Sequence, residues 1–228
     1  LRFGGTEGPD DAMDAVYNWP LVYMLGGSRR SLDLFNFIWE GHIRQYSEAG
    51  MFHREFITAF DWLHNGEGYQ PFFVLPLADP DNPKTRDRII RFADLYTGRD
   101  ASVKNYDPQH KIIRGVLNGS LGPRMEANSE YWTGGKGENM WSQKPEIFYR
   151  VKGDIPQNLV ATCLAVNAYT LTGDNHYRDW VLEYVGAWKE RTEANKGWIP
   201  SNIGPNGIVG EDFKGKWHHG AIAYKNQQ

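Results

Sequence analysis

The fold of this chain is decided by one stretch, residues 154–193, which reads DIPQNLVATCLAVNAYTLTGDNHYRDWVLEYVGAWKERTE. Its first part, Asp154 to Leu171, is apolar almost all round, which predicts a helix that is buried on both sides. The residues TGD at 172–174 turn the chain into a second helix, Asn175 to Glu193. That helix carries large apolar side chains on one face: Tyr177, Trp180, Val181, Tyr184, Val185 and Trp188. The stretch therefore predicts a helical hairpin in which a buried helix precedes an amphipathic one.

Two earlier segments follow the same plan. In the first, the helix Asp10 to Leu25 ends at two glycines, and Ser28 supplies the N-cap of the helix Arg29 to Ala49. The apolar stripe of this second helix comprises Leu32, Phe35, Trp39, His42, Ile43 and Tyr46.

The other segment begins with a helix from Tyr69 to Ala78, turns through DPDNP, and continues as a helix from Lys84 to Thr97. Pro83 suits the first helical turn, with Asn82 as its cap. Ile89, Phe92, Ala93 and Tyr96 form the apolar side of the later helix.

Three such hairpins predict an all-α fold, an array of αα-hairpins in a single domain spanning residues 1–228. The first helix of each pair is expected to be inner and the second outer. Turns within the hairpins are short, whereas the connections between them are long, at about 50–68, 98–153 and beyond 195. In such an array the long connections share one rim, where the inner helices begin. Long connections are usually functional, so this rim, with its loop insertion at about 98–153, is where we expect the site.

Composition narrows the function classes. Of 228 residues, 40% are hydrophobic and 23% are charged, as in ordinary globular proteins, and the formal charge of −3 offers no electrostatic case for nucleic acid. No apolar run approaches the ~20 residues of a membrane-spanning helix. The single cysteine, Cys163, lies in the apolar run LVATCLAV and is expected to be a buried thiol. Aromatic residues reach 14%, and many of the tryptophans lie in loop-like segments, where exposed rings suit sugars.

Three pieces of the sequence resemble the (α/α)-toroid carbohydrate-active enzymes, which include six-hairpin glycosidases, unsaturated-uronyl hydrolases and toroid polysaccharide lyases. The pieces are DAVYNWPLVYMLGG (14–27), HREFITAFDWLHNGEGYQPFFVLPLADPDNP (53–83), and LTGDNHYRDWVLEYVGAWKERT (171–192) followed by GKWHHG (215–220). The resemblance implies a polysaccharide or oligosaccharide substrate and a secreted or periplasmic protein. A complete toroid has six hairpins, so three imply a partial toroid or a homodimer that completes one.

The stretch FDWLHNGEGYQPF, residues 60–72, brings together the leading catalytic candidates Asp61, His64 and Glu67. Asn65-Gly66 is a helix stop that places the first two on the last turn before it. A histidine oriented by a carboxylate can act as a general base near neutral pH. The alternative is a solvated helix end with a local ion pair. His53 and Tyr69 complete the catalytic candidates, as a second base and a phenolic acid.

The substrate-binding candidates are an Arg-, Asn- and Trp-rich set. Arginine binds carboxylates with two parallel hydrogen bonds, and tryptophan offers a stacking surface. The polar stripe of the last inner helix must be hydrogen-bonded or must line a wet cavity. The candidates are Asn18, Trp19, Arg114, Asn118, Arg124, Trp132, Trp141, Asp154 and Asn158.

No cofactor or metal is predicted. The sequence has no HExxH motif and no paired CxxC motifs, and DPDN at 79–82 is better explained as a turn with an N-cap than as a calcium site. TGGKG at 133–137 lacks the spacing of a phosphate-binding loop.

Three functions follow from these residues. The first is a uronate-directed polysaccharide lyase, in which an arginine or asparagine neutralises the sugar carboxylate, His64 or His53 acts as base, and Tyr69 or Tyr17 acts as acid. The second is a glycoside hydrolase that uses two carboxylates from Asp61, Glu67 and Asp154. The third is a non-catalytic glycan-binding or assembly module. An imidazole and a phenol in the cleft would favour the lyase, and paired carboxylates would favour the hydrolase.

Overall fold

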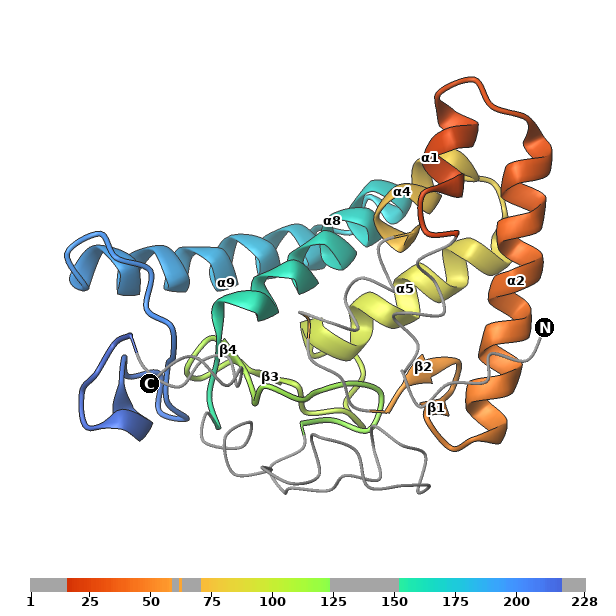
Figure 1. Ribbon diagram of the computed structural model, residues 1–228. Coiled ribbons are helices and arrows are strands. Elements are labelled where there is room, and N and C mark those ends of the chain that lie inside the picture. Colours follow the sequence, from red (N-terminus) through yellow and green to blue (C-terminus); the bar gives the residue numbers. More distant parts are fainter. Residues whose placement is uncertain (1–15, 59–61, 63–70, 124–151, 219–228) are drawn as a thin grey trace.

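The computed structural model describes residues 16–58, 62, 71–123 and 152–218. Within these ranges the chain forms six α-helices and two 3-10 helices, which are shown in Figure 1. The α-helices are α1 (Trp19–Met24), α2 (Arg29–Glu48), α4 (Pro71–Ala78), α5 (Pro83–Thr97), α8 (Ala161–Thr172) and α9 (Asn175–Ala194). The 3-10 helices are η2 (Pro156–Val160) and η3 (Glu211–Phe213). None of the helices described here is long and apolar enough to span a lipid bilayer.

The helices pair as the three predicted αα-hairpins, α1–α2, α4–α5 and α8–α9. Two first helices differ from the predicted bounds, since residues 16–18 form a turn before α1 and the 3-10 helix η2 precedes α8. Each second helix begins at a side-chain cap, and two of the three, Ser28 and Asn82, are the predicted ones. Ser28 Oγ accepts a hydrogen bond from Arg30 N at 3.2 Å, Asn82 Oδ1 accepts from Lys84 N at 3.0 Å, and Asp174 Oδ1 accepts from His176 N at 2.9 Å. Each cap satisfies a backbone N–H that the helix itself leaves unbonded.

The first helices of the three hairpins are neighbours, with α4 in contact with the other two. α4 packs against both α1 and α8, and Figure 1 shows the three side by side. α5 packs against α8 as well as its own partner α4, and α9 packs against α8 and α5. The fold is therefore helix-rich.

Two short β-hairpins make the fold not strictly all-α, which corrects the prediction. β1 (Phe52–His53) pairs with β2 (Phe56–Ile57), and β3 (Tyr106–Asp107) pairs with β4 (Ile112–Ile113), both antiparallel. In the first hairpin the two turn residues, Arg54 and Glu55, have φ of 51° and 73°. Two successive left-handed residues are what a tight two-residue β-turn requires, and neither residue is a glycine that would signal it.

The core joins the hairpins through aromatic rings. Trp39 of α2 meets Phe72 of α4 edge-on at 4.9 Å between ring centroids, and Phe56 of β2 stacks on Phe92 of α5 at 4.7 Å. Tyr96 of α5 lies one turn further along the same helix and is also buried. Edge-on and offset-stacked pairs of this kind stabilise beyond the area they bury. The ring cluster thus fixes β1–β2 against α5.

One side of α8 is exposed, so the predictions of a helix buried on both sides and of Cys163 as a buried thiol are wrong. Cys163 is exposed and Val166 retains 49% of its accessible surface, whereas Leu164, Ala165 and Ala168 are fully buried. α8 packs against α4, α5 and α9 on its other sides. Apolar character alone does not show how many neighbours a helix has.

Candidate functional site

Seven of the predicted site residues lie outside the described residues. They are Asp61, His64, Glu67, Tyr69, Arg124, Trp132 and Trp141. The predicted catalytic corner at 60–72 therefore stays a prediction.

Three predicted site residues near the start of the chain occupy separate elements. His53 lies in β1 with an exposed side chain. Asn18 is exposed at the N-cap position of α1, where its side chain makes no capping hydrogen bond. Trp19 is partly buried and packs against the core. None of the three lines the cavity described below.

Arg114 forms an ion pair beside β3–β4. Its Nη2 donates to Asp107 Oδ2 at 2.8 Å, and His110 Nδ1 lies 3.0 Å from the same oxygen. Burial opposes ionisation of Asp107, but the hydrogen bonds from Arg114 and His110 outweigh it and lower the pKa of Asp107 to about 2. Arg114 therefore holds a carboxylate of the protein itself.

Asn118, Asp154 and Asn158 form a buried network instead of a surface site. All three have no exposed area. Asn118 Oδ1 accepts from the Tyr96 hydroxyl at 3.0 Å, and Asn118 Nδ2 lies 3.3 Å from Asn158 Oδ1. Asn158 Nδ2 donates in turn to Asp154 Oδ1 at 2.8 Å. In the structure these three side chains bond to other groups of the protein, and their role as substrate contacts stays a prediction.

Asp154 is the centre of this network. Its Oδ2 accepts from the Tyr184 hydroxyl at 2.9 Å, from Trp188 Nε1 at 3.2 Å and from Ile113 N at 2.9 Å. Complete burial raises the pKa of Asp154 to about 6, because these hydrogen bonds only partly offset the loss of water. The carboxylate therefore ties α9 to β4 and to the segment that leads into α8.

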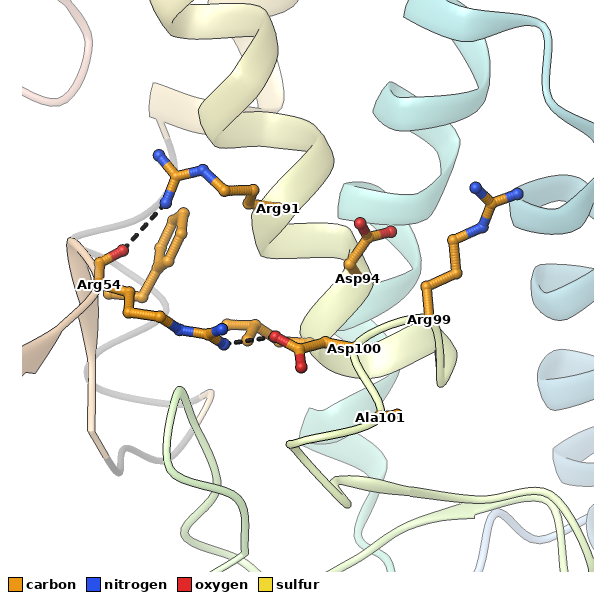
Figure 2. Close-up of a pocket in the computed structure, with 8 residues that line it drawn as sticks. Arg54, Arg91, Asp94, Arg99, Asp100 and Ala101 are labelled. Carbon is orange, nitrogen blue, oxygen red and sulfur yellow. Dashed lines mark hydrogen bonds and ion pairs between the residues drawn. The ribbon is translucent and has the colours of Figure 1, made fainter.

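A cavity of about 320 Å³ opens where the β1–β2 turn meets the C-terminal half of α5 (Figure 2). We call it the arginine cavity. Three segments line it: Arg54 and Phe56 from the β1–β2 hairpin, Arg91, Asp94 and Leu95 from α5, and residues 99–101 after the helix. Its charged lining consists of three arginines and two aspartates. In the parts of the chain that the structure describes, this cavity included, no three His, Cys, Asp or Glu residues are grouped to hold a metal ion.

The segment after α5 reaches the cavity because the helix stops abruptly. Gly98 is the C-cap, with φ of 79°, a left-handed conformation that glycine adopts without strain. Asp100 then returns toward the helix, where its N–H donates to the Asp94 carbonyl oxygen at 3.2 Å. The turn thereby places Arg99, Asp100 and Asp94 around one opening.

A buried ion-pair cluster supports the other wall. Arg88 is only 5% exposed and donates to Glu40 at 2.6 Å and to both oxygens of Glu55 at 3.2 Å. Glu55 also accepts from Arg91 Nη2 at 2.7 Å. Desolvation opposes ionisation of Glu55, but the hydrogen bonds from Arg88 and Arg91 prevail and lower its pKa to about 2. The cluster holds the β1–β2 turn, and hence Arg54, against α5.

The arginines lie close to the acidic groups of the cavity. Figure 2 shows Arg91 donating to the backbone carbonyl oxygen of Arg54 at 3.1 Å, and Arg54 paired with Asp100. Arg91 also lies over the Phe56 ring, 5.4 Å from its centroid. Arg99 pairs with Asp174 and lies over the ring of Tyr177, 5.1 Å from its centroid. These contacts hold the three guanidinium groups in place.

The two aspartates have opposite surroundings. Burial is the largest influence on Asp94 and raises its pKa, although the Tyr177 hydroxyl donates to it at 2.7 Å. Burial also opposes ionisation of Asp100, but hydrogen bonds from the Ser102 hydroxyl, at 2.5 Å, and from Arg54 prevail and lower its pKa. The pKa of Asp94 is thus shifted upward and that of Asp100 downward, and two carboxyl groups whose pKa values are pushed apart are the pattern of an acid and a base.

Sequence reasoning missed this cavity. In the sequence, the pattern places Arg91 and Asp94 on the polar face of an amphipathic helix and Arg54 in a loop. The segment GRDA at 98–101 carried one usable signal, because two charged residues directly follow a glycine helix stop.

The fold and the cavity define a helix-rich chain of three αα-hairpins with arginines and aspartates around one opening. The chain belongs to the family described as "Domain of unknown function (DUF8034)", which matches residues 2–145 and 146–225. Comparison with curated proteins finds no match. Comparison with solved structures finds none either.

Proposed function

We propose that this chain is a carbohydrate-active enzyme, a glycoside hydrolase that cleaves an acidic oligosaccharide or polysaccharide in the arginine cavity. One observation carries the proposal. Asp94 and Asp100 line the same cavity, where burial raises the pKa of Asp94 and hydrogen bonds from Ser102 and Arg54 lower the pKa of Asp100. Glycoside hydrolysis in most enzymes uses two carboxyl groups whose pKa values are pushed apart in this way.

In this proposal Asp94 is the general acid. Its proton passes to the glycosidic oxygen as the bond between that oxygen and the anomeric carbon breaks. The ionised Asp100 either accepts a proton from the attacking water or attacks the anomeric carbon itself, and the separation of the two carboxyl groups in the complex with substrate decides which. The electron pair of the broken bond stays with the leaving oxygen, which departs as a hydroxyl.

The arginines supply the preference for an acidic sugar. A guanidinium has five N–H donors, so Arg54 and Arg91 retain donors for a ligand carboxylate beyond those that bind Asp100 and Glu55. A uronate is the sugar class that matches this lining.

We also propose that the three hairpins are part of an (α/α) toroid. The packing of α4 against both α1 and α8, and of α9 against α8 and α5, supports this arrangement. A second copy of the chain is the partner that could complete the ring, which sedimentation in solution would test by showing a dimer.

A uronate-directed polysaccharide lyase is the second candidate, and the three arginines favour it, since β-elimination needs the sugar carboxylate neutralised. The cavity walls contain no imidazole or phenol among the residues described. The predicted base His64 and the predicted acid Tyr69 lie outside the described ranges. The paired carboxylates therefore place the hydrolase first.

The test is incubation of the purified chain with acidic and neutral polysaccharides, with reducing ends and the ultraviolet absorbance of unsaturated uronates followed together. The hydrolase predicts reducing ends without the absorbance, and the lyase predicts both. Asp94→Asn and Asp100→Asn should each lower hydrolysis by about 100-fold or more. Asp33→Asn is the matched control, because Asp33 is a surface partner of Arg29 on α2. Glycan binding without either product would overturn both enzymes in favour of a binding module.

A further inference from the structure

Two tryptophans near the C-terminal end of the described chain lie outside the core. Trp198 follows α9 and Trp217 follows η3, and their rings stack with 6.0 Å between centroids and 24° between planes. Trp198 is 64% exposed, and Trp217 is partly exposed. The other described tryptophans belong to the core or pack against it. We call Trp198 and Trp217 the tryptophan patch.

Hydrogen bonds to the backbone hold both segments of the patch in place. Asn195, the C-cap of α9, donates from Nδ2 to the Trp198 carbonyl oxygen at 2.8 Å. The Trp217 carbonyl oxygen accepts from Ser201 N at 2.7 Å and from Ser201 Oγ at 3.0 Å. A surface that is already ordered loses little conformational freedom when a ligand binds. The patch is therefore preorganised for binding.

The area of the patch limits the kind of ligand. A tryptophan side chain buries about 150–250 Å² when it is covered, so the pair offers at most about 500 Å². The exposed Ile199 adds one smaller side chain. A stable protein–protein interface covers about 800 Å² on each partner, so a second copy of the chain is disfavoured here. The flat, partly apolar face of a sugar ring matches an exposed indole in size and character.

Charge favours an acidic ligand. The segments that carry the two rings, 195–199 and 214–218, contain three lysines and a histidine but no aspartate or glutamate. The lysines are Lys196, Lys214 and Lys216, and all three are exposed. This local excess of positive charge contrasts with the formal charge of −3 of the whole chain. A polymer that bears carboxylates is attracted to such a surface.

We propose that the tryptophan patch is a second binding surface for an acidic polysaccharide, separate from the arginine cavity. A sugar ring stacks on Trp198, and the lysines attract the carboxylates of the same polymer. Figure 1 shows the described segment after α9 at one end of the molecule, away from the β1–β2 hairpin that lines the arginine cavity. The substrate class rests on the proposed function, but binding at the patch makes and breaks no bond.

Electrophoresis of the folded chain through native gels that contain a polysaccharide tests the proposal. Polygalacturonate and alginate are the acidic probes, and dextran is the neutral one. The parent chain here carries Asp100→Asn, so that hydrolysis does not remove the probe. At least one acidic polymer should retard this parent, and dextran should bind at least about fivefold more weakly. No retardation by either acidic polymer, or equal retardation by dextran, would overturn the proposal.

Variants of Trp198 locate the binding surface. Trp198→Ala should weaken the retardation by about fivefold or more, because the stacking ring is lost, whereas Trp198→Phe should keep most of it. The thermal midpoint should change little in Trp198→Ala, since the side chain is exposed. Phe37→Ala is the matched control, because Phe37 is an aromatic residue on α2 that is 72% exposed. Unchanged retardation in Trp198→Ala would overturn the proposal.

Two further measurements separate this proposal from its alternatives. If the chain without Asp100→Asn releases reducing ends while Trp198→Ala leaves the retardation unchanged, the hydrolase stands and the patch proposal fails. If Trp198→Ala abolishes the retardation and no reducing ends are released, the patch proposal stands and the hydrolase fails. Sedimentation tests self-association: a dimeric parent that becomes monomeric in Trp198→Ala would overturn the proposal in favour of an interface between copies.

Discussion

The Asp154 network and the arginine cavity differ in how their carboxylates are exposed. Asp154 has no exposed area, and five neighbouring groups donate hydrogen bonds to it. Asp94 and Asp100 border an open space, and arginines share their surroundings. Both regions raise the pKa of an aspartate by burial. The difference shows that a shifted pKa marks a site only where the carboxyl can also meet a ligand.

The largest expected effect is that of Asp154→Ala on stability. The change leaves the Tyr184 hydroxyl, Trp188 Nε1 and the backbone N–H of Ile113 without their acceptor inside the core. Each unpaired buried donor costs about 1–3 kcal/mol, so we expect the free energy of unfolding to fall by about 4 kcal/mol or more. Urea denaturation of the variant measures this. Asp33→Ala, at an exposed ion pair, should cost less than about 1 kcal/mol. Equal losses of unfolding free energy in the two variants would show that the buried Asp154 network stabilises the fold no more than a surface ion pair does.

The pH dependence of Asp154 sharpens the comparison. Its pKa is about 6 in the folded chain and 3.8 in the reference state, so the folded state binds the proton more tightly between these values. Stability from this group is therefore fully present below pH 3.8 and is lost as pH rises through 6. Asp154→Asn removes the effect, so the stability of the parent relative to this variant should fall by about 1–3 kcal/mol from pH 4 to pH 7. If the unfolding free energies of the parent and of Asp154→Asn change with pH in the same way, Asp154 does not titrate in this range.

An Asp→Asn substitution in the arginine cavity should change stability little and activity strongly. Asp100→Asn disturbs a partly exposed ion pair with Arg54, so its cost in unfolding free energy should stay within about 1 kcal/mol. Hydrolytic activity should nevertheless fall by about 100-fold or more, because the ionised carboxylate is lost. Denaturation and the reducing-end assay on one preparation separate the two quantities. A stability loss as large as that of Asp154→Ala would mean that Asp100 is structural.

Local sequence signals predicted the hairpins well. Ser28, Asn82 and Asp174 are side-chain caps whose hydrogen bonds form within three residues, and periodicity identified the buried faces of α2 and α5. No local sequence signal predicts the β1–β2 turn, because Arg54 and Glu55 adopt left-handed conformations without being Gly or Asn.

The arginine cavity could not be predicted for a related reason. Its lining comes from residues 54–56, 91–95 and 99–101, which only the packing of β2 on α5 brings together. The polar stripe that begins at Asp154 was predicted to be either hydrogen-bonded or wet, and the deciding partners, Tyr184 and Trp188, come from another helix. Sequence shows that such groups need partners, and tertiary structure shows which partners they have.

Gly98 gives the smallest effect and tests how the cavity is built. At Gly98 an added Cβ meets nothing within 4 Å, so Gly98→Ala suffers only from the left-handed conformation, φ 79°. That conformation costs an L-residue about 1–2 kcal/mol. Gly186 in α9 also has open space around it but is helical, so Gly186→Ala should instead stabilise the chain by about 0.5–1 kcal/mol. Thermal unfolding of both variants measures the signs.

Because Gly98 turns the chain toward Arg99 and Asp100, Gly98→Ala should lower hydrolysis while Gly186→Ala leaves it unchanged. Stabilisation by both alanines would mean that the left-handed turn at Gly98 is not what holds Asp100 beside Asp94.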